Sequence, residues 1–116
     1  MKADTVYLQH IYDATTRIAH YLGDTERDEF YADLILQDAI VRQLQIIGEA
    51  TRILPKAFKQ KHPEIPWEQI IGMRNRIIHE YFRVDLEIVW EVIQNDLPDI
   101  ARQITTILAD STTPGK

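Results

Sequence analysis

RNRIIHEY (residues 74–81) ends a stretch whose spacing predicts one amphipathic helix. At about 100° per residue, its apolar side chains share roughly one third of the helix circumference. These side chains are Ile70, Ile71, Ile77, Ile78 and Tyr81. Arg74 falls in the middle of the same arc. Because an unpaired buried guanidinium costs several kcal/mol, we expect Arg74 to meet a carboxylate, a phosphate or an opening to water.

His79 is the second candidate in this stretch. It follows Arg74 by five residues, which places it about 140° round an ideal helix. The two side chains converge only if the helix frays near Tyr81, or if a second copy of the chain brings its own pair alongside on a two-fold axis. Asn75 and Arg76 precede His79 by one helical turn and could hold the imidazole or add a positive contact.

Length and composition predict one globular domain. The chain has 116 residues, 45% of them hydrophobic, with four glycines and no cysteine, so it can form a single core but no disulfide or thiolate zinc site. Nothing resembles a signal peptide, and no apolar run approaches the ~20 residues that cross a bilayer. We therefore expect a cytoplasmic protein with no membrane partner, a single domain over residues 1–110 and a disordered tail over 111–116.

Charge is unevenly distributed along the chain. The net charge of −5 argues against a general affinity for nucleic acid. From Arg42 to Arg83, however, eight basic and four acidic residues give a local charge of +4, and the remainder carries −9. This basic middle could form a patch for a polyanion, although ordinary scatter of charges over solvated faces is the alternative.

Apolar residues at intervals of three and four predict helices over residues 4–21, 34–54 and 86–108. Pro98 predicts a kink or break in the last of them. Trp67 is expected to anchor the core or a dimer rather than to stack on bases. Four to five helices with short connections imply an all-α, up-and-down bundle.

One polar seam interrupts the otherwise apolar helix over 34–54. Its members lie three and four residues apart, and they are Asp38, Arg42, Gln45, Glu49 and Arg52. The seam either faces water and holds ion pairs, or its Asp38 or Glu49 receives Arg74 and orients it. In the second case Gly48, which is costly inside a helix, would mark a place where another backbone comes close.

An arginine beside a histidine, without a nucleophilic serine or cysteine or a metal-ligand cluster, suits a phosphodiester whose own 2′-hydroxyl attacks. Histidine, with an ordinary pKa of about 6.5, could move the proton, so His79 is the candidate acid or base. Arg74 would bind the phosphate and stabilise the transition-state charge. The substrate would be RNA and not DNA, since DNA lacks this hydroxyl. Neither a metal nor a cofactor is required.

The pattern Arg-x4-His-x-Tyr, read at Arg74, His79 and Tyr81, resembles the signature of the HEPN superfamily. Within it the chain is similar to HepT-type toxins, small helical ribonucleases encoded beside a minimal nucleotidyltransferase antitoxin. The resemblance extends from Asp38 to Ile100. Its supporting elements are Ile46-Ile47-Gly48-Glu49-Ala50, Pro66-Trp67 and residues 85–90.

This resemblance implies an HEPN-like, two-fold homodimer whose interface holds Arg74 and His79. It further implies a metal-independent endoribonuclease acting as the toxin of a type VII-like toxin–antitoxin pair. In HepT-type toxins the partner nucleotidyltransferase uses ATP to modify the motif tyrosine with AMP, so the resemblance makes Tyr81 the regulatory target. The alternative is a non-catalytic helical module that binds a nucleotide or another protein.

Overall fold

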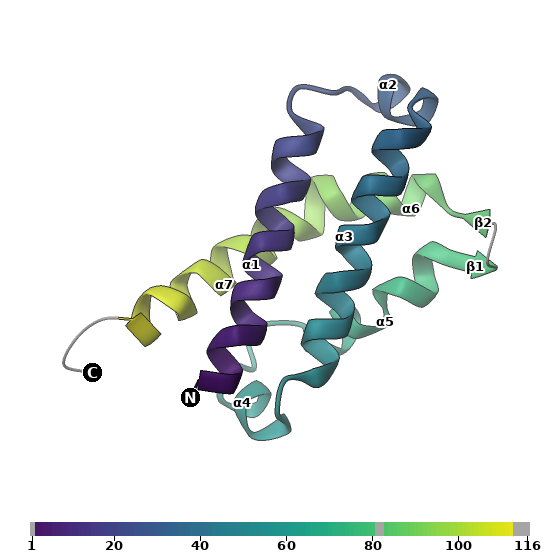
Figure 1. Ribbon diagram of the computed structural model, residues 1–116. Helices are drawn as coiled ribbons and strands as arrows, with labels where there is room; N and C mark the ends of the chain where they lie inside the picture. Colours follow the sequence, from purple (N-terminus) through teal and green to yellow (C-terminus); the bar gives the residue numbers. More distant parts are fainter. Residues whose placement is uncertain (1, 81–82, 113–116) are drawn as a thin grey trace.

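The first half of the chain forms an antiparallel pair of long helices. The computed structural model describes residues 2–80 and 83–112. In it α1 (Lys2–Leu22) and α3 (Leu34–Ile53) lie side by side, and the short α2 (Arg27–Ala32) lies between them in the chain, at one end of the pair (Figure 1). The two long helices predicted from the apolar spacing are thus confirmed.

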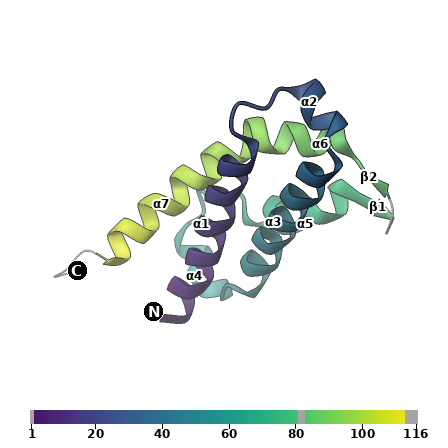
Figure 2. The same cartoon turned by 45° about the horizontal axis from the view of Figure 1, so that its top comes forward.

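The second half completes the bundle. After α4 (Lys56–Lys61) and α5 (Trp67–Ile77) the chain forms a small antiparallel sheet of β1 (Ile78–Glu80) and β2 (Arg83–Val84). Next, α6 (Leu86–Glu91), the π-helical turn η1 (Val92–Asp96) and α7 (Leu97–Thr112) follow one another as a long helix that crosses behind α1 (Figure 1, Figure 2). The predicted all-α bundle is confirmed. None of the helices in the described ranges is long and apolar enough to span a bilayer.

A single hydrophobic core holds these helices together. α1 contributes Leu8, Ile11, Ala14 and Ile18, each only 1% exposed, and it contacts both α3 and α7. Each large apolar side chain buried in this way contributes roughly 1.5–3 kcal/mol. The helix ends where Gly23 adopts a φ of +51°, a left-handed conformation that glycine adopts without steric cost. α1 and α3 thus both connect the two halves of the bundle, α1 through α7 and α3 through α5.

Gly48 lies where α3 meets α5. It is buried, and a Cβ atom added to it would lie 3.7 Å from the carbonyl oxygen of Ile70. The expectation that another backbone approaches Gly48 is confirmed, and the approaching segment is the helix that carries Arg74. The contact positions the first turn of α5 relative to α3.

The long C-terminal helix changes its hydrogen bonding just before Pro98. The amide of Leu97 donates to the carbonyl oxygen of Val92, the pattern of a π-helix. Proline lacks an amide hydrogen and cannot donate to residue 94, so the interruption predicted here takes the form of a π-helical turn. Beyond it α7 continues to Thr112, past the expected domain end at residue 110, and residues 113–116 lie outside the described ranges.

Candidate active site

The buried side of α5 differs from the predicted one. Ile70, Met73 and Ile77 are buried at intervals of three and four, and Ile70 meets Gly48 of α3. Arg74 is exposed, so the prediction that it lies in the middle of a buried arc is wrong. Packing against α3 sets the buried side, and Arg74 lies at its edge in the last turn.

α5, the helix that carries Arg74 and is called the motif helix below, is also shorter than the sequence predicts. α5 ends at Ile77, and Ile78 has extended backbone angles, φ −107° and ψ 107°. Two adjacent β-branched residues followed by aromatic ones favour a strand over a helix. The prediction of one helix through Tyr81 is therefore wrong, because the chain leaves the helix before His79.

The first strand of the hairpin carries the candidate histidine. β1 and β2 pair antiparallel, Ile78 opposite Val84 and Glu80 opposite Arg83, with an irregular register between the two pairs. His79 thus belongs to a strand, and the angular separation from Arg74 on an ideal helix does not apply. The side chains of His79 and Glu80, and all of Tyr81 and Phe82, lie outside the described residues. Predictions about the imidazole and about Tyr81 stay predictions.

Two hydrogen bonds of Asp85 hold the base of this hairpin, where it meets α5 and α6. The amide of Asp85 donates to the carbonyl oxygen of Ile77 across 2.7 Å. The Asp85 carboxylate accepts from the amide of Ile88 at 3.2 Å and caps α6. The start of β1 and the end of β2 are therefore both held at the junction where α5 ends and α6 begins.

Arg74 has no partner within the described part of the chain: no ion pair or side-chain hydrogen bond there involves its guanidinium. Other arginines do have carboxylate partners, such as Arg102, whose Nη1 lies 2.9 Å from an Asp99 oxygen. An exposed cation without an internal carboxylate keeps its charge available to an external anion. Arg74 therefore meets the opening to water that the sequence analysis expects of it.

Glu49, one expected partner of Arg74, is engaged elsewhere. Its Oε1 accepts a hydrogen bond from Arg52 Nε at 3.2 Å, and this bond lowers the pKa of Glu49 below its ordinary value. Glu49 also lines a shallow hollow with Tyr7 and His10 of α1. Its partner is the arginine one turn along the same helix, as in the solvated-seam interpretation, and not Arg74.

Asp38, the other expected partner, lies beside the strand of His79. It is exposed and lines a hollow of about 290 Å³ together with Arg42 of α3, Ile78 and Val84. Arg42 belongs to the predicted polar seam but not to the predicted site residues. Its spacing of four residues from Asp38 was the available signal.

Asn75 and Arg76 are both exposed on the last turn of α5. Arg76 lines a separate cavity of about 260 Å³ between α5 and the C-terminal helix, together with Asp96 and Asp99. The structure thus brings Asp38 next to β1 but places Arg76 at a different hollow.

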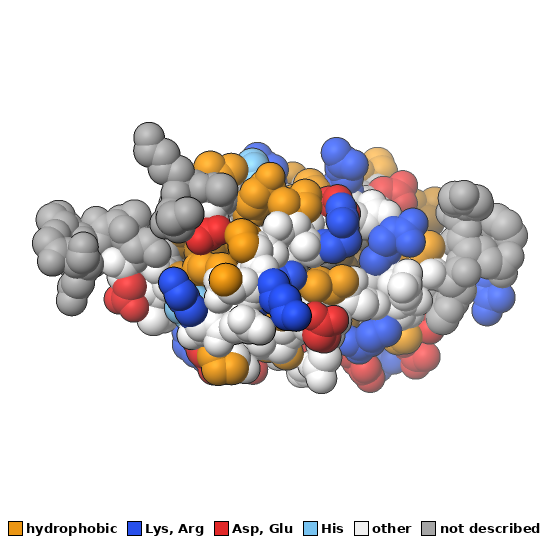
Figure 3. Space-filling model, turned by 90° about the horizontal axis from the view of Figure 1, so that it is seen from below, with side chains coloured by type: hydrophobic (Ala, Val, Ile, Leu, Met, Phe, Trp, Pro, Cys, Tyr) orange, Lys and Arg blue, Asp and Glu red, His pale blue; other side chains and the backbone are white. Residues whose placement is uncertain are grey.

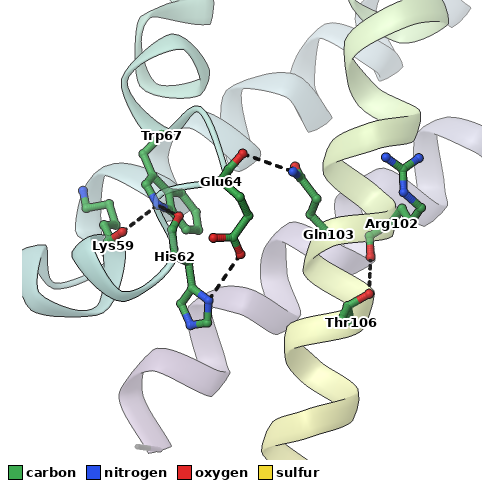
Figure 4. Close-up of polar contacts among 7 residues, drawn as sticks. All are labelled: Lys59, His62, Glu64, Trp67, Arg102, Gln103 and Thr106. Atoms are coloured by element: carbon green, nitrogen blue, oxygen red, sulfur yellow. Dashed lines mark hydrogen bonds and ion pairs between the residues drawn. The ribbon is translucent and has the colours of Figure 1, made fainter.

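Trp67 fixes the start of α5. It is 7% exposed, and its Nε1 donates to the carbonyl oxygens of Lys59 at 3.0 Å and His62 at 2.9 Å (Figure 4). The expectation of a core anchor is confirmed. Because the indole ties α5 to α4, the helix that presents Arg74 is held at both ends.

The structure is thus an all-α bundle in which an exposed arginine, without a partner among the described residues, lies on the last turn of α5, and a histidine follows on β1. The family model described as "Ribonuclease HepT-like" matches residues 11–107. The chain belongs to this family.

Relatives with similar sequences carry ribonuclease names. A protein of Caldanaerobacter subterraneus subsp. tengcongensis, named "Putative RNase TTE0752", is 41% identical over 93% of this chain and 96% of its own length. "Probable ribonuclease HepT" of Thermococcus cleftensis is 38% identical over 81% of this chain and 86% of its own length. No solved structure gives a significant match.

Proposed function

We propose that this chain is a metal-independent endoribonuclease whose catalytic residues are Arg74 and His79, and that it acts in the cytoplasm as the toxin of a toxin–antitoxin pair. The membership of the HepT-like family supports the activity on RNA. The observation that carries the site is the exposed Arg74, without a carboxylate partner in the described residues, on the last turn of the helix that leads into the strand of His79.

The proposed reaction needs the protein to transfer a proton and to stabilise negative charge on the phosphate. The 2′-oxygen of a ribose attacks the adjacent phosphorus, the bond to the 5′-oxygen breaks, and a 2′,3′-cyclic phosphate and a 5′-hydroxyl result. His79 moves the proton as base or acid. Arg74 binds the phosphate through its planar fork and offsets the charge that develops on the phosphoryl oxygens. Asn75, on the same turn of α5 as Arg74, and Asp38, beside β1, are the proposed supporting residues.

Cleavage of a single-stranded RNA in EDTA tests the proposal. The parent protein is compared with Arg74→Ala and His79→Ala, and with the matched controls Arg17→Ala and His20→Ala, whose side chains are exposed on α1. We expect the controls to retain the parent's rate and the two motif variants to lose at least about 100-fold, the size typical of an acid–base or charge-stabilising residue. Equal cleavage by all five proteins would disprove the proposal.

The requirement for a 2′-hydroxyl nucleophile gives a second test. An RNA with a single 2′-deoxynucleotide at the cleaved position should resist cleavage, because it lacks the nucleophile. Cleavage of that substrate, or loss of activity in EDTA that added Mg²⁺ restores, would indicate a different mechanism. RNA binding without cleavage by the parent would favour the non-catalytic module instead.

We further propose that the active form is a two-fold homodimer in which the pair of catalytic residues is completed across the interface. The two variants provide the test, because mixing inactive Arg74→Ala and His79→Ala proteins restores one intact composite site in each mixed dimer. Random exchange should return about a quarter of the parent's activity. No recovery after subunit exchange, checked by mass spectrometry of the mixed dimer, would place both residues of a site in one protomer.

The proposed regulation concerns Tyr81, and it rests on the spacing of the HepT-type motif. The tyrosine oxygen would attack the α-phosphorus of ATP, held by the cognate nucleotidyltransferase antitoxin, and pyrophosphate would leave. The added phosphodiester near Arg74 would occupy the charge that the RNA needs.

Intact-mass spectrometry after co-expression with the neighbouring nucleotidyltransferase tests this regulation. We expect added AMP units on the parent and none on Tyr81→Phe, which should also remain active in the presence of the antitoxin. AMP on Tyr81→Phe would assign the modification to another residue.

A further inference from the structure

The short helix α4 carries positive charge without compensation. Its sequence, KAFKQK, has three lysines and no acidic residue. Lys56 and Lys61, called the α4 lysines below, are exposed and have no ion pair with any residue that the structure describes. By contrast, Arg52 near the end of α3 is paired with Glu49. The α4 lysines are therefore charges open to an external anion.

α4 is held firmly although it is only six residues long. The third lysine, Lys59, donates from Nζ to the carbonyl oxygen of Thr51 at 3.1 Å and so caps the end of α3. The Trp67 indole binds the carbonyl oxygens of Lys59 and His62 (Figure 4). The ring of Phe58 lies 4.8 Å from that of His62. Because these contacts immobilise the helix, the α4 lysines point outward from a fixed platform.

A groove connects this platform to the motif helix. Lys56, Lys59 and Gln60 form one side of it, and Trp67 and Gln69 of α5 form the other. Arg74 follows Trp67 by seven residues, which is about 10 Å along the axis of α5. At about 3.4 Å per nucleotide along a stacked strand, this part of the path corresponds to roughly three nucleotides, and the separation between the α4 lysines and Trp67 adds to it.

Seen from the side of α4, Lys and Arg side chains are spread over the face that extends from this helix toward the hairpin (Figure 3). Acidic side chains lie between them, and Glu68 lines the groove itself. A chain of phosphates could contact individual cations on this face. The excess of negative charge lies in the rest of the molecule, outside residues 42–83.

We propose that the α4 lysines form a second RNA contact, which holds single-stranded RNA at a distance from the phosphate bound at Arg74. This inference rests on the proposed ribonuclease function and names the surface along which the substrate enters the site. Contacts of this kind bind phosphates and not bases, so they supply affinity without sequence specificity. They release counterions, and each makes binding more sensitive to salt.

Fluorescence anisotropy with a 5′-labelled single-stranded RNA tests the inference in a His79→Ala background, which should bind without cleaving. Lys56→Ala/Lys61→Ala is compared with Arg17→Glu, an exposed site on α1 that changes the net charge by the same amount. Lys59 is left unchanged because its bond to Thr51 is structural. Circular dichroism and the melting temperature check that each variant is folded.

We expect the double lysine variant to weaken binding and to reduce the slope of log K against log salt by about 1.4, the value for two phosphate contacts on a single strand. Arg17→Glu should leave the slope unchanged. In the His79-containing protein, the lysine variant should raise KM at unchanged kcat. Equal effects of both variants, an unchanged slope or no RNA binding by the parent would overturn the inference.

The two proposals fail in different ways. If the parent binds RNA but does not cleave it, and the lysine variant reduces the salt slope as expected, the nuclease proposal fails and the α4 surface remains. If the parent cleaves RNA and the lysine variant does so with the same KM and salt slope, the α4 surface fails and the nuclease remains.

Discussion

The amide of Asp85 donates to the carbonyl oxygen of Ile77 across 2.7 Å, closing the β hairpin on the last residue of α5. A hairpin of so few residues is marginal by itself. This bond and the cap that the Asp85 side chain forms on α6 attach it to two helices. The strand of His79 is therefore positioned by the junction of α5 and α6 rather than by its own pairing.

Removing the side chain of Asp85 should loosen this junction. We expect Asp85→Ala to lower the free energy of unfolding by about 1 kcal/mol, since it removes an N-cap. Urea unfolding measures the change. Asp85→Asn is the control, because asparagine caps as well as aspartate. An equal loss in both variants would attribute the effect to the charge and not to the cap.

Gly48 should tolerate a methyl group. A Cβ there would make ordinary van der Waals contact with the carbonyl oxygen of Ile70 at 3.7 Å, and alanine is favoured over glycine inside a helix by about 1 kcal/mol. We therefore expect Gly48→Ala to raise the free energy of unfolding by up to that amount. Gly23→Ala is the opposite control and should be destabilising, because Gly23 has a φ of +51°.

A loss of stability in Gly48→Ala would mean that α3 and α5 approach each other more closely than the structure indicates. Thermal melts of the two glycine variants, run beside the parent, give the comparison.

Two buried glutamines on α3 should respond in opposite directions to replacement by methionine. Gln43 Oε1 is buried without a hydrogen-bond partner in the described residues, whereas Gln37 Nε2 donates to the carbonyl oxygens of Phe30 and Tyr31 at 3.0 and 3.1 Å. We expect Gln43→Met to stabilise by about 1 kcal/mol, and Gln37→Met to destabilise by a similar amount. Denaturant unfolding of the pair is decisive, and destabilisation by both would mean that Gln43 has a partner in solution.

The pKa of Glu49 reports which arginine it faces. Its hydrogen bond to Arg52 lowers this pKa, so the pair's contribution to stability is present above the ordinary carboxyl pKa and is lost as the pH falls through the lowered value. We expect Arg52→Ala to raise the pKa of Glu49 toward its ordinary value and Arg74→Ala to leave it unchanged. NMR titration of the side-chain carboxyl carbon measures both, and a shift in Arg74→Ala would show that Glu49 also interacts with Arg74.

Local signals in the sequence were sufficient for much of the fold. The three-four spacing over residues 4–21 depends on residues close in the chain, and the helix that it predicts is confirmed. Pro98 predicts an interruption, and the structure has a π-helical turn directly before it. The environment of Arg74 depends instead on which side of α5 meets α3. Periodicity alone did not distinguish the arc centred on Arg74 from the buried side formed by Ile70, Met73 and Ile77.

The end of the motif helix was missed for a related reason. Ile77, Ile78 and Tyr81 continue the helical spacing, and this outweighed the strand preference of the same residues. The bond between Asp85 and Ile77, which stabilises the alternative, joins residues on either side of the hairpin. Only the folded arrangement reveals it.

The π-helical turn at residues 92–96 contains one residue more than an α-helix would need to cover the same path. Deleting a single residue there would convert it to regular α-helix and rotate everything that follows by about 100°. Ile100, Ile104 and Ile107, which are buried in the native arrangement, would then swing out toward solvent. The one extra residue in this turn thus determines which side of α7 faces the core. A chain without it would need a different set of α7 side chains in contact with α1.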